Sequence, residues 1–209
     1  MPQSPHLPDR IAAIRDELRS ISPDLLARRT AARFSPSAQD QGEFELDFWG
    51  KKILITYPDF IARDAQLGKE LSLDAQGVLA YYFLTSDGEP EAGRWVSFAD
   101  LPGGRFYARA YQGYSGDELV KAFQNDLEQF SSAAGRVGGQ PLPLGDRAYA
   151  FRALPRVPLS VVYWQGDEDF PASAQVLFDA SAGHHLPIDV CAILGGMLAG
   201  RLVRARNTP

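Results

Sequence analysis

VPLSVVYWQGDEDFPASAQVLFDA, residues 157–180, is the stretch that decides the fold of this chain. Residues 157–164 and 174–180 are rich in valine and aromatic side chains, as β-strands are, and the acidic turn between them predicts an antiparallel pair. Residues 148–154 predict a third neighbouring strand, and residues 187–204 an apolar helix with a basic end. Helices cluster early, in the middle and at the end. We therefore expect an α+β fold, a mainly antiparallel sheet with helices packed on it.

The rest of the chain adds elements of the same two kinds. Sequence periodicity and capping residues predict two helices over residues 9–33, a hairpin over 42–58, a helix over 72–88, a short strand near 95, and two helices from Arg105 onward, the second capped near Ser115. The glycine- and proline-rich residues 133–146 predict a loop. Too little apolar sequence follows this loop to form a second core. We therefore expect a single domain over residues 1–209, with a disordered N-terminus over residues 1–8.

Composition limits the classes of function. Of the 209 residues, 45% are hydrophobic and 22% charged, which is typical of a folded globular protein. The net charge of −5 gives no positive field for a phosphate backbone, so nucleic acid is not an expected partner. The single cysteine, Cys191, excludes an intramolecular disulfide and any four-thiolate metal site built from this chain alone. Without a signal-like segment or a run long enough to span a bilayer, we expect a soluble cytoplasmic protein with no membrane association.

Two groups of metal-ligand residue types flank the last predicted strand. Asp167, Glu168 and Asp169 precede it, and His184 and His185 follow it. A strand of six or seven residues separates its ends by about 20 Å, whereas the ligands of one ion lie within about 2 to 2.6 Å of it. The two groups should therefore not share a site within one subunit.

The acidic turn has two interpretations. It is a solvated turn, or it is a structured turn anchored by Phe170 and stiffened by Pro171. A structured turn could cap a neighbouring helix, pair with an arginine, or hold a cation through Asp167, Glu168 and Asp169. The last of these roles makes the three carboxylates our candidate metal ligands.

Aromatic and arginine residues gather between Arg94 and Tyr114. If the chain is helical from Arg105, then Arg105 and Arg109 stack at i, i+4 beside a stripe of Tyr107 and Tyr111. Such a face suits a planar, acidic small molecule, with rings against aromatics and an acid group against a guanidinium. The candidate ligand-binding residues are Trp95, Arg105, Tyr107, Arg109, Tyr111 and Trp164. The alternative is that the aromatics belong to the core and the arginine stems cover them.

No catalytic residue is assigned. The sequence contains no phosphate-binding glycine motif, serine nucleophile elbow or zinc-protease helix. Cys191 falls within an apolar helix, where a thiol is inert.

Two blocks of the sequence resemble an uncharacterised bacterial and archaeal family, domain of unknown function 3786. The first is GRWVSFADLPGGRFY, residues 93–107, and the second is PLSVVYWQGDEDFPASAQVLFDASAGHHLPIDV, residues 158–190. The resemblance covers roughly residues 21–203, and its matching positions are Trp95, Phe98, Leu101, Pro102, Gly103, Gly104, Trp164, Asp167, Glu168, Phe170, Pro171 and Asp179. It implies a setting in anaerobic redox or corrinoid metabolism, because the family includes members with an iron–sulfur domain fused to this one. This chain departs from that arrangement, since it has no cysteine cluster.

These observations lead to three hypotheses. The first is a module that binds a small molecule or partner. In its most specific version the ligand is anionic and planar, such as a tetrapyrrole. The second is a metal-dependent hydrolase or lyase that uses Asp167, Glu168 and Asp169. The third is an accessory protein that docks on an iron–sulfur enzyme. The sequence leaves the ligand, any reaction, the cofactor and homo-oligomerisation open.

Overall fold

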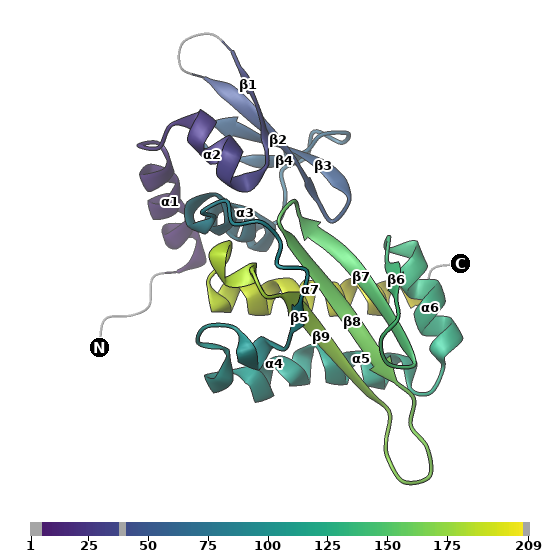
Figure 1. The fold of residues 1–209 in the computed structure, drawn as a ribbon. Coiled ribbons are helices and arrows are strands. Elements are labelled where there is room, and N and C mark those ends of the chain that lie inside the picture. The colour runs from purple at the N-terminus through teal and green to yellow at the C-terminus, as the bar shows by residue number, and fades with distance from the viewer. Residues whose placement is uncertain (1–5, 38–40, 207–209) are drawn as a thin grey trace. The chain divides into compact units, whose positions relative to one another are not determined.

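The structure is a computed structural model that describes residues 6–37 and 41–206 (Figure 1). The chain divides into two compact units. The N-terminal unit contains the residues up to Pro90 together with Leu154–Arg156 and His184–Pro187, and the C-terminal unit contains the remainder. Each unit has helices and its own antiparallel sheet, so the predicted α+β class is confirmed, with the strands in two sheets rather than one. The single-domain organisation stays a prediction.

The N-terminal unit is built on a four-stranded antiparallel meander. Its strands follow chain order: β1 (Arg33–Pro36), β2 (Gly42–Phe48), β3 (Lys51–Tyr57) and β4 (Ala62–Asp64). Strict alternation along β2 buries Phe44 and Leu46, which lie opposite Ile55 and Ile53 of β3. This hairpin confirms the one predicted over residues 42–58.

Three helices complete the N-terminal unit: α1 (Leu7–Leu18), α2 (Pro23–Thr30) and α3 (Leu73–Thr85). The ring of Phe83 in α3 lies 4.9 Å from that of Phe44, which joins helix and sheet in one core. Of the residues predicted to be disordered, 1–5 lie outside the described residues, while Leu7 and Pro8 already belong to α1. A proline is compatible with a first helical turn.

The C-terminal unit holds a five-stranded antiparallel sheet in the order β5-β9-β8-β7-β6. Its strands are β5 (Trp95–Val96), β6 (Gln140–Leu142), β7 (Arg147–Leu154), β8 (Val157–Trp164) and β9 (Ser173–Asp179). Residues 157–163 of β8 are all buried, as expected for a central strand with a continuous apolar sequence. The pairing of β8 with β9 confirms the antiparallel pair expected in residues 157–180.

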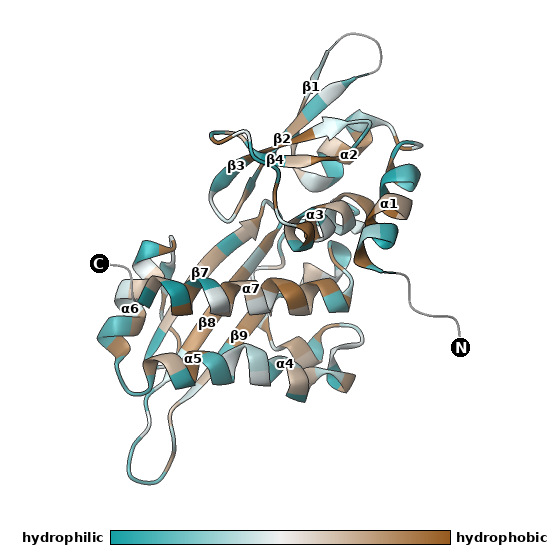
Figure 2. Cartoon of the chain, turned by 180° about the vertical axis from the view of Figure 1, so that it is seen from behind, coloured by the Kyte–Doolittle hydropathy of each residue, from teal (hydrophilic) through white to brown (hydrophobic). Residues whose placement is uncertain are grey.

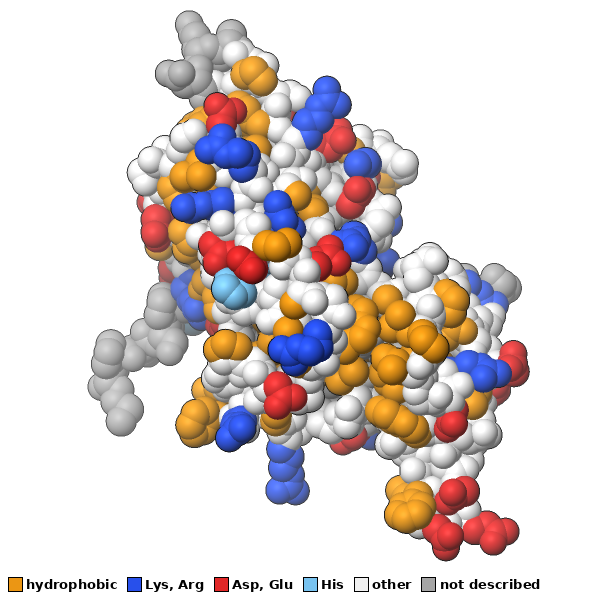
Figure 3. Space-filling view, viewed as in Figure 1, with side chains coloured by type: hydrophobic (Ala, Val, Ile, Leu, Met, Phe, Trp, Pro, Cys, Tyr) orange, Lys and Arg blue, Asp and Glu red, His pale blue; other side chains and the backbone are white. Residues whose placement is uncertain are grey.

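Helices lie across one face of this sheet (Figures 1 and 2). They are α4 (Ala108–Tyr114), α5 (Gly116–Phe123), α6 (Leu127–Arg136) and α7 (Ile188–Arg206). The chain also forms three short 3₁₀ turns, η1 (Phe98–Asp100), η2 (Gly104–Phe106) and η3 (Ala182–His184). The last residue of η3, His184, belongs to the N-terminal unit. Hydrophobic side chains also gather over the strands on the face turned toward the viewer in Figure 3. None of the helices in the described part of the chain has both the length and the apolar character needed to cross a membrane.

Two local predictions in this unit are wrong. Residues 133–146 are not simply a loop, because they include the end of α6 and the edge strand β6. The helix expected from Arg105 begins only at Ala108, because Gly104–Phe106 forms a 3₁₀ turn first. Arg105 and Arg109 are therefore not one turn apart on a single α-helix.

Candidate binding groove

The acidic turn is structured, and the backbone explains why. One carboxylate oxygen of Asp167 accepts hydrogen bonds from the backbone N–H groups of Asp169 (2.9 Å) and Phe170 (2.8 Å). The N–H of Asp167 donates to the carbonyl of Phe170 at 2.8 Å. Asp167 thus stabilises the turn through these hydrogen bonds, while Glu168 and Asp169 are exposed at its tip. Across the described residues, no group of three or more His, Cys, Asp or Glu side chains is placed to hold a metal ion.

The histidines belong to the N-terminal unit and have separate partners. The Nδ1 of exposed His184 lies 2.8 Å from a carboxylate oxygen of Asp87. His185 is fully buried, and its Nδ1 lies 2.8 Å from the hydroxyl of Ser86. That hydroxyl donates to the carbonyl of Arg29, also at 2.8 Å, so it accepts from His185. The pair is therefore not a serine nucleophile with its base, which would require the serine proton to point at the imidazole.

The two histidines should give opposite contributions to the pH dependence of stability. Burial lowers the pKa of His185, so its contribution is present above about pH 6.5 and is lost as the pH falls. The hydrogen bond to Asp87 raises the pKa of His184, so that contribution is present below about pH 6.5 and is lost as the pH rises through the raised value. We expect His185→Phe to remove the loss of stability between about pH 7.5 and 5.5, and His184→Gln to steepen it. Urea unfolding at several pH values measures both slopes, and an unchanged slope in His185→Phe would contradict the assignment.

Asp179 has a structural role in the C-terminal unit. Its side chain is buried and accepts hydrogen bonds from the N–H groups of Ala92, Arg94 and Ser181 and from the Ser181 hydroxyl. Burial alone would raise the pKa of Asp179, but these hydrogen bonds outweigh it and the pKa lies below its usual value. A charged Asp179 therefore fixes the segment that enters β5.

The six predicted ligand-binding residues do not form one site. Trp95 pairs with Asp179 at one end of β9, whereas Trp164 pairs with Ser173 at the other end. Six residue steps of a strand separate these positions by about 20 Å. The two tryptophans therefore cannot contact one small ligand together.

Tyr111 belongs to the core and not to an exposed stripe with Tyr107. Its side chain is 3% exposed, against 61% for Tyr107. Its ring stacks on Phe98 at 4.1 Å, and its hydroxyl donates to the carbonyl of Val176 at 3.4 Å. Burial raises the pKa of Tyr111 well above its usual value. The alternative of core aromatics thus holds for Tyr111.

Tyr107 instead lines an apolar groove of about 740 Å³ between α4 and α7. Tyr107, Ala110 and Tyr114 follow one another at i, i+3 and i+7, which puts them on one side of α4. The α7 side contributes Ile188, Asp189, Ala192, Ile193 and Gly196, and Phe98 forms part of the lining. Tyr114 and Ile193 keep 45% and 42% of their surface exposed. A volume of this size with a mostly apolar lining and few polar groups is typical of small-molecule sites.

Charge around the groove is uneven. Asp189 is the acidic member of its lining, on the α7 side. Arg105 and Arg109 are exposed and flank Tyr107 in the chain, but neither belongs to the lining. The groove itself therefore offers aromatic and aliphatic contacts, with guanidinium groups outside it. Cys191 offers no nucleophile, because its burial, with a smaller effect of Asp189, raises the pKa of its thiol to about 12.

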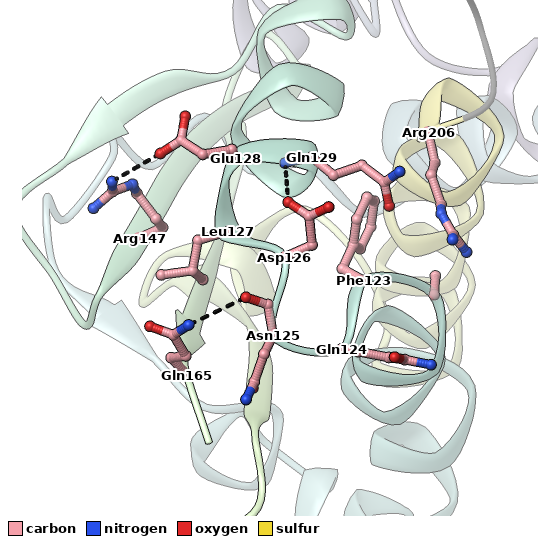
Figure 4. Close-up of a pocket in the computed structure, with 11 residues that line it drawn as sticks. Phe123, Gln124, Asn125, Asp126, Leu127, Glu128, Gln129, Arg147, Gln165 and Arg206 are labelled. Atoms are coloured by element: carbon pink, nitrogen blue, oxygen red, sulfur yellow. Dashed lines mark hydrogen bonds and ion pairs between the residues drawn. The ribbon is translucent and has the colours of Figure 1, made fainter. Parts of the chain in front are cut away.

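A second, polar pocket of about 700 Å³ lies where α5 turns into α6 (Figure 4). Asp126 caps α6 by accepting from the N–H of Gln129, and Arg147 pairs with Glu128 at 3.2 Å. The Asn125 side chain exchanges two hydrogen bonds with the backbone of Gly166. These groups join the α5–α6 turn to the base of the β8–β9 hairpin, so the polar side chains around this pocket are largely used for structure.

The α7 half of the groove was not predicted from the sequence. Ile188 and Ile193 lie in a long apolar segment whose sequence is typical of a buried helix. Nothing in that sequence indicates that these two side chains line a groove. The spacing of Tyr107, Ala110 and Tyr114 is that of one helix face and could be found in the sequence.

Comparison with known families gives one result. A family model described as domain of unknown function (DUF3786) matches residues 23–201, which include both sequence blocks quoted above. Searches of curated proteins and of solved structures each returned no significant match.

Proposed function

This chain belongs to the DUF3786 family, a domain of unknown function, and we propose its function from the groove. We propose that it is a module that binds a planar, largely apolar small molecule between α4 and α7. The observation that carries the proposal is the groove lining, where large apolar side chains from two helices stay exposed around a volume suited to one ligand.

A tetrapyrrole or corrinoid is the ligand class that we propose. Its ring system would lie against Tyr107 and Tyr114, and acid groups at its edge would extend beyond the lining toward Arg105 and Arg109. This agrees with the setting in anaerobic redox or corrinoid metabolism that the family resemblance implies. We propose a cytoplasmic location, where a single reduced cysteine is usual.

The metal-dependent alternative has less support. Asp167 uses its carboxylate to hold the hairpin turn, and Glu168 and Asp169 bring no third protein ligand with them in the described residues. No observation favours docking on an iron–sulfur enzyme over the groove.

Absorbance titration with haem and with cobalamin tests the proposal. We expect saturable binding to the wild-type protein and a loss of affinity of at least about tenfold in Ala110→Trp, whose indole would fill the groove. Ala110 is exposed, so this change should leave folding intact. Tyr107→Ala should also weaken binding, because it removes one aromatic wall.

Phe170→Ala is the matched control, since it removes an exposed aromatic side chain that does not line the groove. Equal affinity of wild type and Ala110→Trp for every ligand tested would contradict the proposal. Arg105→Ala and Arg109→Ala distinguish the contacts of the ligand's acid groups from those of its ring. Both variants should bind the dianionic haem more weakly and bind a neutral corrinoid as the wild type does.

A further inference from the structure

Among the described residues that line the α4–α7 groove, Asp189 is the one charged side chain. Its side chain is exposed, and one of its carboxylate oxygens accepts a hydrogen bond of 3.1 Å from the N–H of Val190. A carboxylate has acceptor sites for several hydrogen bonds, so Asp189 can also accept from a ligand. It lies on the face of α7 that borders the groove, because the α7 residues of the lining recur at i, i+3, i+4 and i+7: Asp189, Ala192, Ile193 and Gly196.

The two ends of the groove differ in chemistry. At one end Tyr114 packs against Gly196, where an added Cβ on the glycine would lie 3.3 Å from the tyrosine ring. At the other end an added Cβ on Gly103 would lie 3.5 Å from the side chain of Ile188, the residue before Asp189. Both views of the fold show α4 beside the N-terminal half of α7 (Figures 1 and 2). The seven-residue step along α7 places the carboxylate end about 10 Å from the apolar end.

The Asp189 end of the groove also has an aromatic ring. Tyr107 directly precedes α4 and belongs to the lining, with 61% of its surface exposed. A carboxylate attracts a cation through its charge, and the face of an aromatic ring attracts it through its quadrupole. Arg105 and Arg109 lie outside the lining, and helical residues two positions apart do not face the same way. A ligand inside the groove therefore meets negative charge and not positive charge.

We propose that the groove selects its ligand by charge: the part of the ligand inside it presents a positive charge or N–H donors to Asp189, and carboxylates are disfavoured there. This inference rests on the proposed function, since it concerns the ligand of the same groove. Acid groups of a ligand would then lie outside the groove. Of the two proposed ring classes, a corrinoid edged with amides fits better than a haem edged with carboxylates, because amide N–H groups donate to a carboxylate.

NMR titration of the isotope-labelled protein with two probes of the same ring system tests the proposal. Naphthylmethylamine is a cation near neutral pH, and naphthoate is an anion. We expect the wild type to bind the cation about tenfold more tightly than the anion, and Asp189→Asn, which keeps the shape of the side chain but removes its charge, to bind both with similar affinity. By the same reasoning, Asp189→Asn should strengthen the binding of haem.

Asp169→Asn is the matched control, because it removes an exposed carboxylate that does not line the groove and should leave the affinity ratio of the two probes unchanged. Added salt should reduce the ratio in the wild type and have little effect on it in Asp189→Asn. A wild type that binds both probes equally, or an Asp189→Asn variant that keeps the preference for the cation, would overturn the proposal.

The same titrations distinguish this failure from failure of the proposed function. If Ala110→Trp prevents binding of both probes while Asp189→Asn leaves their affinity ratio unchanged, the groove binds ligands but Asp189 does not select them. If the wild type binds neither probe, or if Ala110→Trp binds both as the wild type does, the groove is not the binding site and both proposals fail.

Discussion

Gly195→Ala is expected to destabilise the C-terminal unit by about 3 kcal/mol, because the added methyl group has no space. A Cβ at Gly195 of α7 would lie 2.2 Å from the hydroxyl oxygen of Tyr111 and 2.7 Å from its ring. Tyr111 cannot move away easily, since its ring is stacked on Phe98 and packed against Phe178. Urea unfolding followed by circular dichroism measures the change in the free energy of unfolding.

Two variants control this prediction. Gly135→Ala lies in α6, where a Cβ would meet no atom within 4 Å, so we expect a stabilisation of about 0.5 to 1 kcal/mol from helix propensity. In a Tyr111→Leu background the cost of Gly195→Ala should fall, because the aromatic ring that clashes is gone. Equal costs in both backgrounds would show that the clash with Tyr111 is not the cause.

Tyr111 and Tyr107 illustrate what the sequence could and could not predict about the site. Both were expected on one exposed stripe, but Tyr111 is 3% exposed and stacks on Phe98, whereas Tyr107 at the N-cap of α4 is 61% exposed. The predicted i, i+4 pairing of Arg105 with Arg109 was wrong as well, because Arg105 lies in the 3₁₀ turn and only Arg109 lies in α4. The sequence shows which residues of this segment are aromatic, but it did not show which of their side chains are buried and which are exposed.

The hairpins over residues 42–57 and 157–179 were predictable, because alternating or continuous β-branched and aromatic residues leave little choice of structure. Short edge strands such as β4 and β6 were not, since three residues give no periodicity. The groove depends on contacts between α4 and α7, which lie far apart in the chain. A single sequence contains no local signal for such a contact.

The acidic turn has a structural role that its sequence indicated only in part. A metal site shared by these carboxylates and the histidines within one subunit was not expected, because the predicted strand between them is about 20 Å long. The structure adds that Asp167 builds the turn, because its carboxylate accepts hydrogen bonds from the backbone of Asp169 and Phe170.

Gly104→Ala is the substitution for which we expect the largest effect, a loss of about 3 to 5 kcal/mol in the free energy of unfolding of the C-terminal unit. A Cβ at Gly104 would lie 1.8 Å from the backbone carbonyl oxygen of Phe98, so the backbone of η1 or η2 must move. The Phe98 side chain lines the groove and supports Tyr111, hence the same movement should also weaken ligand binding. Chemical denaturation and the haem titration measure the two effects separately.

Gly113→Ala provides the matched control in the same segment. A Cβ there meets no atom within 4 Å, and the residue lies inside α4, so the variant should be as stable as the wild type or more stable by up to about 1 kcal/mol. If Gly104→Ala unfolded like Gly113→Ala, the close approach of η2 to the Phe98 carbonyl would not be a requirement of the fold. Since the turn of residues 101–104 precedes the aromatic wall of the groove, its glycine is best explained as the residue that lets the backbone place Phe98 and Tyr107 beside α7.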